Sequence, residues 1–226
     1  IDAARYEEMY RRSLAEPEAF WREQAAILDW MKPFTRVKDT SFSPSDVHIR
    51  WFADGALNAC ANCLDRWAVD KPDAAAILWE GDAPGQKRRV TWRDLLDEVS
   101  RLANVLKSLG VNKGDFVSVY LPGIPEAVAA VLACARIGAV HSVVFSGFSA
   151  EALAGRIADC GSRVLITADE ALRGGRHVPL KANADAAIAG LPAVEHVLVV
   201  RRTGGDAPFN PGRDHWYHEA LAAASP

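Results

Sequence analysis

The strongest constraint on the fold of this 226-residue chain is a regular alternation of apolar runs and helical segments after residue 115. Runs rich in β-branched residues predict strands over residues 116–121, 139–145, 163–167 and 195–200. Helices are expected between them, over residues 125–138, 150–160 and 180–191, each closed or followed by Gly or Pro. Strands this apolar that alternate with helices indicate a parallel sheet flanked by helices on both faces. The predicted fold class is therefore α/β.

The preceding residues show a different pattern. An amphipathic helical period runs over residues 2–30, and Glu16-Pro17-Glu18 predicts a break between two helices. Residues 31–50 have few apolar positions in period and predict an irregular segment that wraps the surface. We therefore expect a helical and irregular extension over residues 1–55 and an α/β subdomain over residues 56–226.

Three further elements are expected at the start of that subdomain. Residues 56–69 have a helical pattern, and residues 74–79 and 88–91 read as two short strands across a turn. Thr91 can then cap a helix whose apolar stripe ends at Gly110, with Asp94 adding negative charge to its first turn.

Composition excludes several classes of function. With 26 Lys plus Arg against 29 Asp plus Glu, the formal net charge of −3 gives no indication of nucleic-acid binding. The longest apolar runs are about half of the roughly 20 residues that a membrane helix needs. The chain begins without Met or a signal-peptide pattern, so we expect residues before Ile1 in a longer protein.

The four cysteines fit no disulfide framework or paired zinc spacing, which favours a reducing, cytoplasmic compartment. Cys60 and Cys63 form a C-x-x-C. Two small apolar residues on one helix are a simpler interpretation of this pair than a redox or metal site. His215 and His218 are spaced as on a surface helix and have no carboxylate or Cys at metal-ligand spacing. No metal site is predicted.

The candidate ligand site lies in the loops that follow the strands, because ligands of open parallel sheets bind outside the carboxyl ends of the strands. The loop over residues 168–177 contains Arg173-Gly174-Gly175-Arg176. Two guanidinium groups can bind phosphate through paired hydrogen bonds, and the glycines allow a close approach of backbone. A solvated turn is the alternative interpretation of these four residues.

The loop over residues 145–149 is a second candidate. Gly147 exposes backbone amides next to a helix N-terminus that Ser149 can cap, and such a position favours anions. Phe145 or Phe148 could stack on a base, or both rings could belong to the core. The sequence contains no G-x-S-x-G, H-E-x-x-H, Walker A or G-x-G-x-x-G motif that would indicate other chemistry.

Several long segments resemble, in sequence and in order, those of the AMP-forming acetyl-CoA synthetases, a family of adenylate-forming acyl-CoA ligases. The segments that carry the resemblance are Tyr10-Arg11-Arg12-Ser13, Pro17-Glu18-Ala19-Phe20-Trp21, Trp51-Phe52-Ala53-Asp54-Gly55, Cys63-Leu64-Asp65-Arg66, Ala135-Arg136-Ile137-Gly138-Ala139-Val140-His141-Ser142-Val143-Val144-Phe145, Gly147-Phe148-Ser149, Arg173-Gly174-Gly175-Arg176 and Val178-Pro179-Leu180-Lys181. They run from end to end of the chain.

The resemblance implies a two-step reaction, in which acetate and ATP with Mg²⁺ form acetyl-AMP and the thiol of coenzyme A (CoA) then displaces AMP. It also implies that Arg173 and Arg176 contact the phosphorylated ADP end of CoA and that Phe145, Ser146 and Gly147 lie near its adenine. Many relatives have Gly where this chain has Ser146.

The family's ATP-phosphate loop, its acetate pocket and its catalytic Lys have no counterpart in these residues. The resemblance therefore implies an N-terminal part that contains no catalytic residue and only part of the CoA site, and that is inactive by itself. Two alternatives stay open: the same region of a ligase for propionate or another short acid, and a non-catalytic binding module.

Overall fold

The computed structural model describes residues 1–226, which form two compact units, Ile1–Asn62 and Cys63–Pro226. The predicted functional division into residues 1–55 and 56–226 stays a prediction. No helix in the structure is both long enough and apolar enough to cross a membrane.

The first unit opens with the two expected helices, α1 (Ala3–Ala15) and α2 (Pro17–Ala25). The Asp2 carboxylate accepts a hydrogen bond from the Arg5 amide at 2.8 Å and caps α1. Pro17 opens α2 because a first-turn residue needs no amide hydrogen. The predicted break at Glu16-Pro17 is confirmed.

The prediction of an irregular segment over residues 31–50 is wrong. β1 (Lys38–Ser43) and β2 (Asp46–Trp51) form an antiparallel hairpin there, in a register that pairs Phe42 with Val47. The strands were missed because neither contributes a buried apolar face: Phe42, Val47 and Ile49 are all exposed. Side-chain pairs link the strands instead, and Asp39 contacts both His48 and Arg50.

The second unit is built on a five-stranded, wholly parallel sheet with the order β11-β10-β7-β5-β6. Its strands are β5 (Phe116–Tyr120), β6 (Val140–Val143), β7 (Val164–Ala168), β10 (His196–Val200) and β11 (Asp214–Trp216). β7 is buried along its whole length, as a central strand covered on both faces requires. Four of these strands and the α/β fold class are confirmed; β11 was not predicted.

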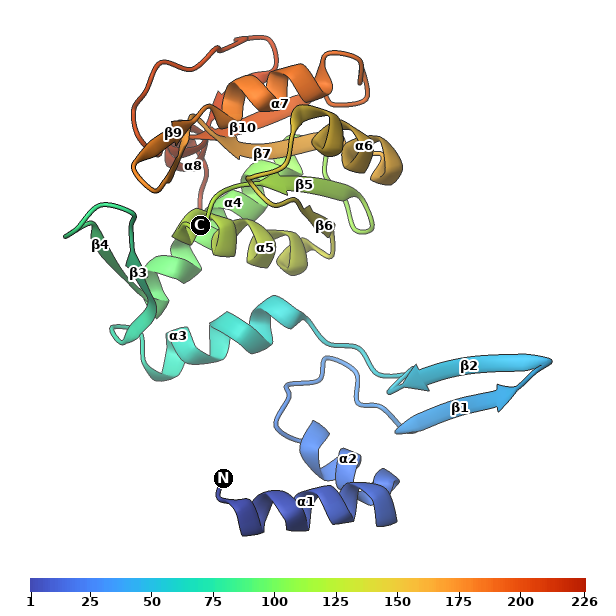
Figure 1. The fold of residues 1–226 in the computed structure, drawn as a ribbon. Coiled ribbons are helices and arrows are strands. Elements are labelled where there is room, and N and C mark those ends of the chain that lie inside the picture. Colours follow the sequence, from blue (N-terminus) through green and yellow to red (C-terminus); the bar gives the residue numbers. More distant parts are fainter. The chain divides into compact units, whose positions relative to one another are not determined.

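Helices cover the sheet in two groups (Figure 1). One group contains α4 (Trp92–Ser108), α5 (Pro125–Ile137) and α8 (Tyr217–Ala223), and the other contains α6 (Ala150–Cys160) and α7 (Leu180–Ile188). The Thr91 hydroxyl accepts from the Asp94 amide, which confirms the predicted cap of α4. The Asp94 carboxylate also accepts from the Thr91 amide, which completes a capping box that was not predicted.

Shorter elements begin at the boundary between the units, at Ala61, and continue within the second unit. A helical stretch comprises the π-helix η1 (Ala61–Asp65) and α3 (Arg66–Asp70), followed by the antiparallel pair β3 (Ala75–Glu80) and β4 (Lys87–Thr91). A second antiparallel pair, β8 (Ala171–Arg173) and β9 (Arg176–Val178), lies where the sequence predicted a loop. Gly174-Gly175 is a two-residue sequence typical of a tight β-hairpin turn, and this turn joins the two strands.

A buried ionic network holds the β11 edge of the sheet. The Lys181 ammonium is completely buried and lies 2.7 Å from the carboxylates of both Asp185 and Asp214. Arg213 contacts the same two carboxylates. The cation therefore ties α7 to the start of β11.

Candidate functional site

Three loops meet at the carboxyl edge of the sheet, after β5, β6 and β7. They enclose a cavity of about 280 Å³. The residues that line it are Pro122, Gly123, Phe145, Ser146, Gly147, Ala171, Leu172, Arg173 and Val178. Four of the predicted site residues, namely Phe145, Ser146, Gly147 and Arg173, therefore lie around one cavity, at the edge where parallel sheets bind ligands.

A cation, an aromatic ring and a glycine are packed together in this cavity. The Arg173 guanidinium lies 5.6 Å from the centroid of the Phe145 ring, which is a cation–π distance. A Cβ atom on Gly147 would lie 2.5 Å from the Phe145 ring and 3.1 Å from Arg173 Nη1, so no larger residue fits without displacing one of them. Phe145 is 58% exposed and does not belong to the core, which leaves its ring accessible to a planar group.

The backbone of this loop is held by a buried tyrosine. The Tyr120 hydroxyl donates hydrogen bonds to the carbonyl oxygens of Ser146, at 3.2 Å, and Phe148, at 2.9 Å. Burial raises the pKa of Tyr120, so its hydroxyl keeps its proton. The Ser149 hydroxyl accepts from the Ala152 amide at 3.3 Å, which confirms the predicted cap of α6.

The other three predicted residues lie at the tip of the β8–β9 hairpin and do not line the cavity. Gly174 and Gly175 both have positive φ, at 56° and 74°, as a two-residue type I′ turn requires. Arg173 and Arg176 are paired across the hairpin, and both are exposed. The turn thus places the exposed Arg176 directly across the hairpin from Arg173, which lines the cavity.

The residues that support this hairpin from the β3–β4 connection were not predicted from the sequence. The Asp82 carboxylate accepts hydrogen bonds from the amides of Gly174 and Gly175. Nearby, the Arg202 guanidinium lies 4.9 Å from the Trp79 ring centroid, in the wall of a second cavity of about 250 Å³. Both cavities are lined by Pro122, Gly123 and Leu172. Gly81-Asp82 was a visible turn signal, but its long-range partners could not be predicted.

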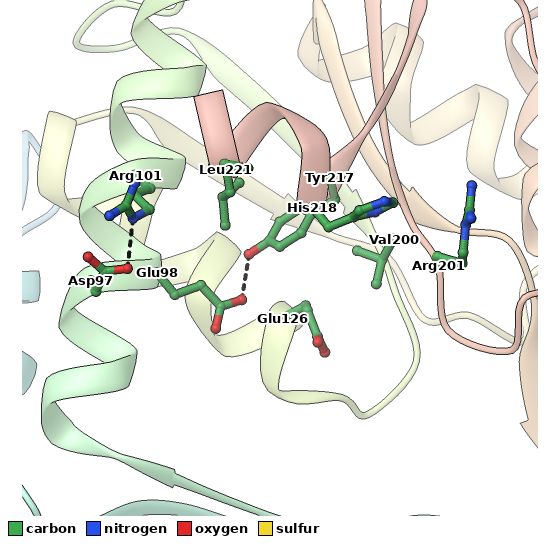
Figure 2. A pocket seen from close by; sticks show the side chains of 10 residues that line it. Asp97, Glu98, Arg101, Glu126, Val200, Arg201, Tyr217, His218 and Leu221 are labelled. Atoms are coloured by element: carbon green, nitrogen blue, oxygen red, sulfur yellow. Dashed lines mark hydrogen bonds and ion pairs between the residues drawn. The ribbon is translucent and has the colours of Figure 1, made fainter. Parts of the chain in front are cut away.

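A larger cavity, of about 570 Å³, lies elsewhere, among α4, α5, α8 and the end of β10 (Figure 2). The buried Tyr217 hydroxyl donates to Glu98 there at 2.7 Å. Burial raises the pKa of Glu98, although the hydrogen bond from Tyr217 opposes the effect. Three carboxylates, those of Asp97, Glu98 and Glu126, and two guanidinium groups, those of Arg101 and Arg201, line this cavity. Arg101 is paired with Asp97, so the cavity is a poorer place for a phosphate than the loop cavity.

Two other sequence interpretations can be compared with the structure. His215 and His218 do not share a surface helix, because His215 lies on β11 and His218 on α8. His215 instead lies 3.2 Å from His196 of the neighbouring strand, and burial and this second ring lower its pKa. The helical period was misread across a strand–helix junction. Cys60 and Cys63 are free thiols, one buried and one exposed.

Comparison with known proteins identifies the family of the chain. Residues 64–222 match the family described as AMP-binding enzyme, and residues 6–63 match the one described as acetyl-coenzyme A synthetase N-terminus. The acetyl-coenzyme A synthetase of Methylocella silvestris is 57% identical over 227 residues, and that of Beijerinckia indica is 59% identical. Each alignment covers 100% of this chain and 35% of the relative.

A solved structure, the acetoacetyl-CoA synthetase from Streptomyces lividans, matches with a TM-score of 0.83 at 30% identity. The match covers 96% of this chain and 32% of that one, so the chain spans about a third of the length of its relatives. The chain therefore belongs to the AMP-binding enzyme family, and along its whole length it is similar to the N-terminal third of acetyl-coenzyme A synthetases.

Proposed function

We propose that the chain is the N-terminal part of an AMP-forming acetate–CoA ligase and contributes part of its CoA site. The residues proposed to bind CoA are Phe145, Ser146, Gly147, Arg173, Gly174, Gly175 and Arg176. One observation supports the proposal most: the Arg173 guanidinium lies beside the exposed ring of Phe145 and beside Gly147, which has no room for a side chain.

This arrangement suits the nucleotide end of CoA. Arginine binds phosphate oxygens through paired, charge-assisted hydrogen bonds, and an exposed aromatic ring can stack on a purine. The loop cavity, at about 280 Å³, is the size of a subsite for one planar ring rather than for the whole cofactor. The remaining contacts to CoA would come from the rest of the protein.

The reaction proceeds in two steps in this proposal. Acetate attacks the α-phosphorus of ATP and releases pyrophosphate, and the CoA thiol then attacks the carbonyl carbon of acetyl-AMP and releases AMP. We assign no catalytic residue to this chain. ATP, Mg²⁺ and acetate would be bound by other parts of the protein, and the chain by itself would catalyse neither step.

The choice of acid is a separate question. The acetoacetyl-CoA synthetase is named for a different acid, yet its corresponding part has the same fold. Specificity for acetate over propionate would therefore depend on residues outside this chain. We assign acetate because relatives that are 57% and 59% identical are named acetyl-coenzyme A synthetase. We place the enzyme in the cytoplasm because all four cysteines are free thiols.

Steady-state kinetics on the full-length protein that contains this chain would test the proposal. Arg173→Ala plus Arg176→Ala should raise the KM for CoA by about 10- to 100-fold, since each charge-assisted hydrogen bond contributes roughly 1.5–3 kcal/mol before solvent screening. Acetate-dependent exchange of pyrophosphate into ATP, which reports the first step alone, should be unchanged.

A matched control removes two positive charges from the opposite edge of the sheet. Lys107 lies in the last turn of α4 and Lys113 in the connection from α4 to β5, and both are exposed. Lys107→Ala plus Lys113→Ala should leave the KM for CoA within about twofold. Equal effects of the two double variants would contradict the proposed site.

A further inference from the structure

The amides of the Gly174-Gly175 turn are already occupied by an anionic group of the protein. Asp82 Oδ1 lies 3.3 Å from the Gly174 nitrogen, and Oδ2 lies 2.7 Å from the Gly175 nitrogen. Because both glycines are in the left-handed region, their two N–H groups converge on one carboxylate. The partners are separated by 92 and 93 residues in the chain, so these bonds are tertiary contacts and not part of the turn itself.

The segment that carries Asp82 is fixed to the loops around the cavity. The Gly81 amide donates to the Gln86 carbonyl at 2.7 Å, which closes the β3–β4 connection. The Gln86 side-chain oxygen accepts from Arg202 Nη2 at 3.1 Å. Trp79 Nε1 donates to the Gly123 carbonyl at 2.7 Å. Asp82 is thus held by the loops that follow β5 and β10.

The positive charges of the two hairpin arginines are not neutralised by a carboxylate of the chain. Neither Arg173 nor Arg176 forms an ion pair with a carboxylate of the chain. Asp82, the acidic residue that contacts the turn, directs both oxygens to the glycine amides. The Arg173 guanidinium faces Phe145 and Gly147 instead. The carboxylate therefore holds the backbone of the hairpin without neutralising its side chains.

We propose that Asp82 is a positioning residue for phosphate binding. It fixes the β8–β9 turn against the β3–β4 connection, so that Arg173 at the cavity and Arg176 across the hairpin from it keep the geometry that binds the nucleotide end of CoA. The inference rests on the proposed function. A two-residue hairpin with three-residue strands would otherwise move freely at its exposed tip, and its arginines would lose the preorganisation on which affinity depends.

The opposite role would make Asp82 a competitor. An anion held by these amides would have to leave if a phosphate of CoA bound to them, and its removal would then tighten binding. The two roles predict effects of opposite sign on the affinity for CoA.

The test uses Asp82→Ala and the isosteric Asp82→Asn in the full-length protein, with the KM for CoA and the rate of acetate-dependent pyrophosphate exchange as readouts. A positioning role predicts a KM for CoA raised about 5- to 20-fold by Asp82→Ala and less by Asp82→Asn, which keeps one acceptor oxygen. The rate of pyrophosphate exchange should stay within twofold of the parent rate. A general loss of folded protein would lower that rate as well. Asp159→Asn, which removes one exposed charge at the end of α6, is the matched control.

The combined variant separates this inference from the proposed function. If Asp82 acts through the arginines, Asp82→Asn should add less than twofold to the KM for CoA in the Arg173→Ala plus Arg176→Ala background. A tighter or unchanged KM for CoA in both single variants would overturn the positioning role while leaving the arginine site intact. No effect of the arginine variants themselves would instead overturn the proposed function.

Discussion

At the scale of single residues, the most costly side chain to disturb is the buried Lys181. Its ammonium has no solvent contact and depends on Asp185 and Asp214 for compensation of its charge. Removing one partner of a buried pair leaves charge without compensation, which commonly costs about 3–5 kcal/mol. The network therefore links the start of β11 to α7 in addition to the pairing of β11 with β10.

Asp214→Asn should lower the free energy of unfolding by about 3 kcal/mol at pH 7, measured by urea denaturation. Burial acts to raise the pKa of Asp214, but hydrogen bonds from Arg213, the Asn210 amide and Lys181 outweigh it, so the net pKa is lowered. The stability that depends on the ionised carboxylate is present above the unfolded pKa of about 3.9 and is lost as pH falls through the folded value. The difference between variant and parent should shrink below pH 4, and a pH-independent difference would contradict this.

The contribution of Glu98 to the free energy of unfolding should depend on pH in the opposite sense. Its pKa is raised mainly by burial, so its contribution to stability is fully present below the unfolded pKa of about 4.3 and is lost as pH rises through the folded value. Glu98→Gln keeps an acceptor for Tyr217 and cannot ionise. The free energy of unfolding of this variant minus that of the parent should be larger at pH 8 than at pH 4, which means that the variant gains stability relative to the parent as pH rises. The same trend in Glu151→Gln, at an exposed site on α6, would refute the assignment.

At the scale of elements, α4 shows how far local sequence determines structure. Thr91 and Asp94 bond each other's amides at 3.1 Å, and this capping box fixes the first residue of a 17-residue helix. Thr91→Ala should lower the free energy of unfolding by about 1 kcal/mol, measured by chemical denaturation. Ser100→Ala, in the middle of the same helix, is the control and should be neutral or slightly stabilising. Equal losses in both variants would contradict a role for the cap.

Other elements were predictable only in part. β5, β7, β10 and the helices between the strands follow from the sequence, since burial gives these strands continuous apolar runs. β6 also follows from its apolar run, although three of its four residues are exposed. The β1–β2 hairpin was missed because its strands are exposed and held by polar pairs such as Asp39–His48. β11 was missed because its three residues, 214–216, are too short for a period and are held by a long-range ion pair.

At the scale of the whole molecule, chain order and sheet topology bring the candidate site together. Loops after consecutive parallel strands must lie at one edge of the sheet, which is why Phe145, Gly147 and Arg173 could be grouped before the structure was known. The contact from Asp82 to the glycine turn could not be foreseen. It depends on how the β3–β4 hairpin, which is not part of the parallel sheet, packs against the loops.

The central claim concerns the nucleotide end of CoA, and isothermal titration calorimetry on the full-length protein tests it most directly. We predict that Arg173→Ala plus Arg176→Ala weakens CoA binding at least tenfold. Dephospho-CoA, which lacks the 3′-phosphate, should show a smaller difference between the variant and the parent protein. If the double variant bound CoA as tightly as the parent protein, the assignment of this edge of the sheet as part of the CoA site would be wrong.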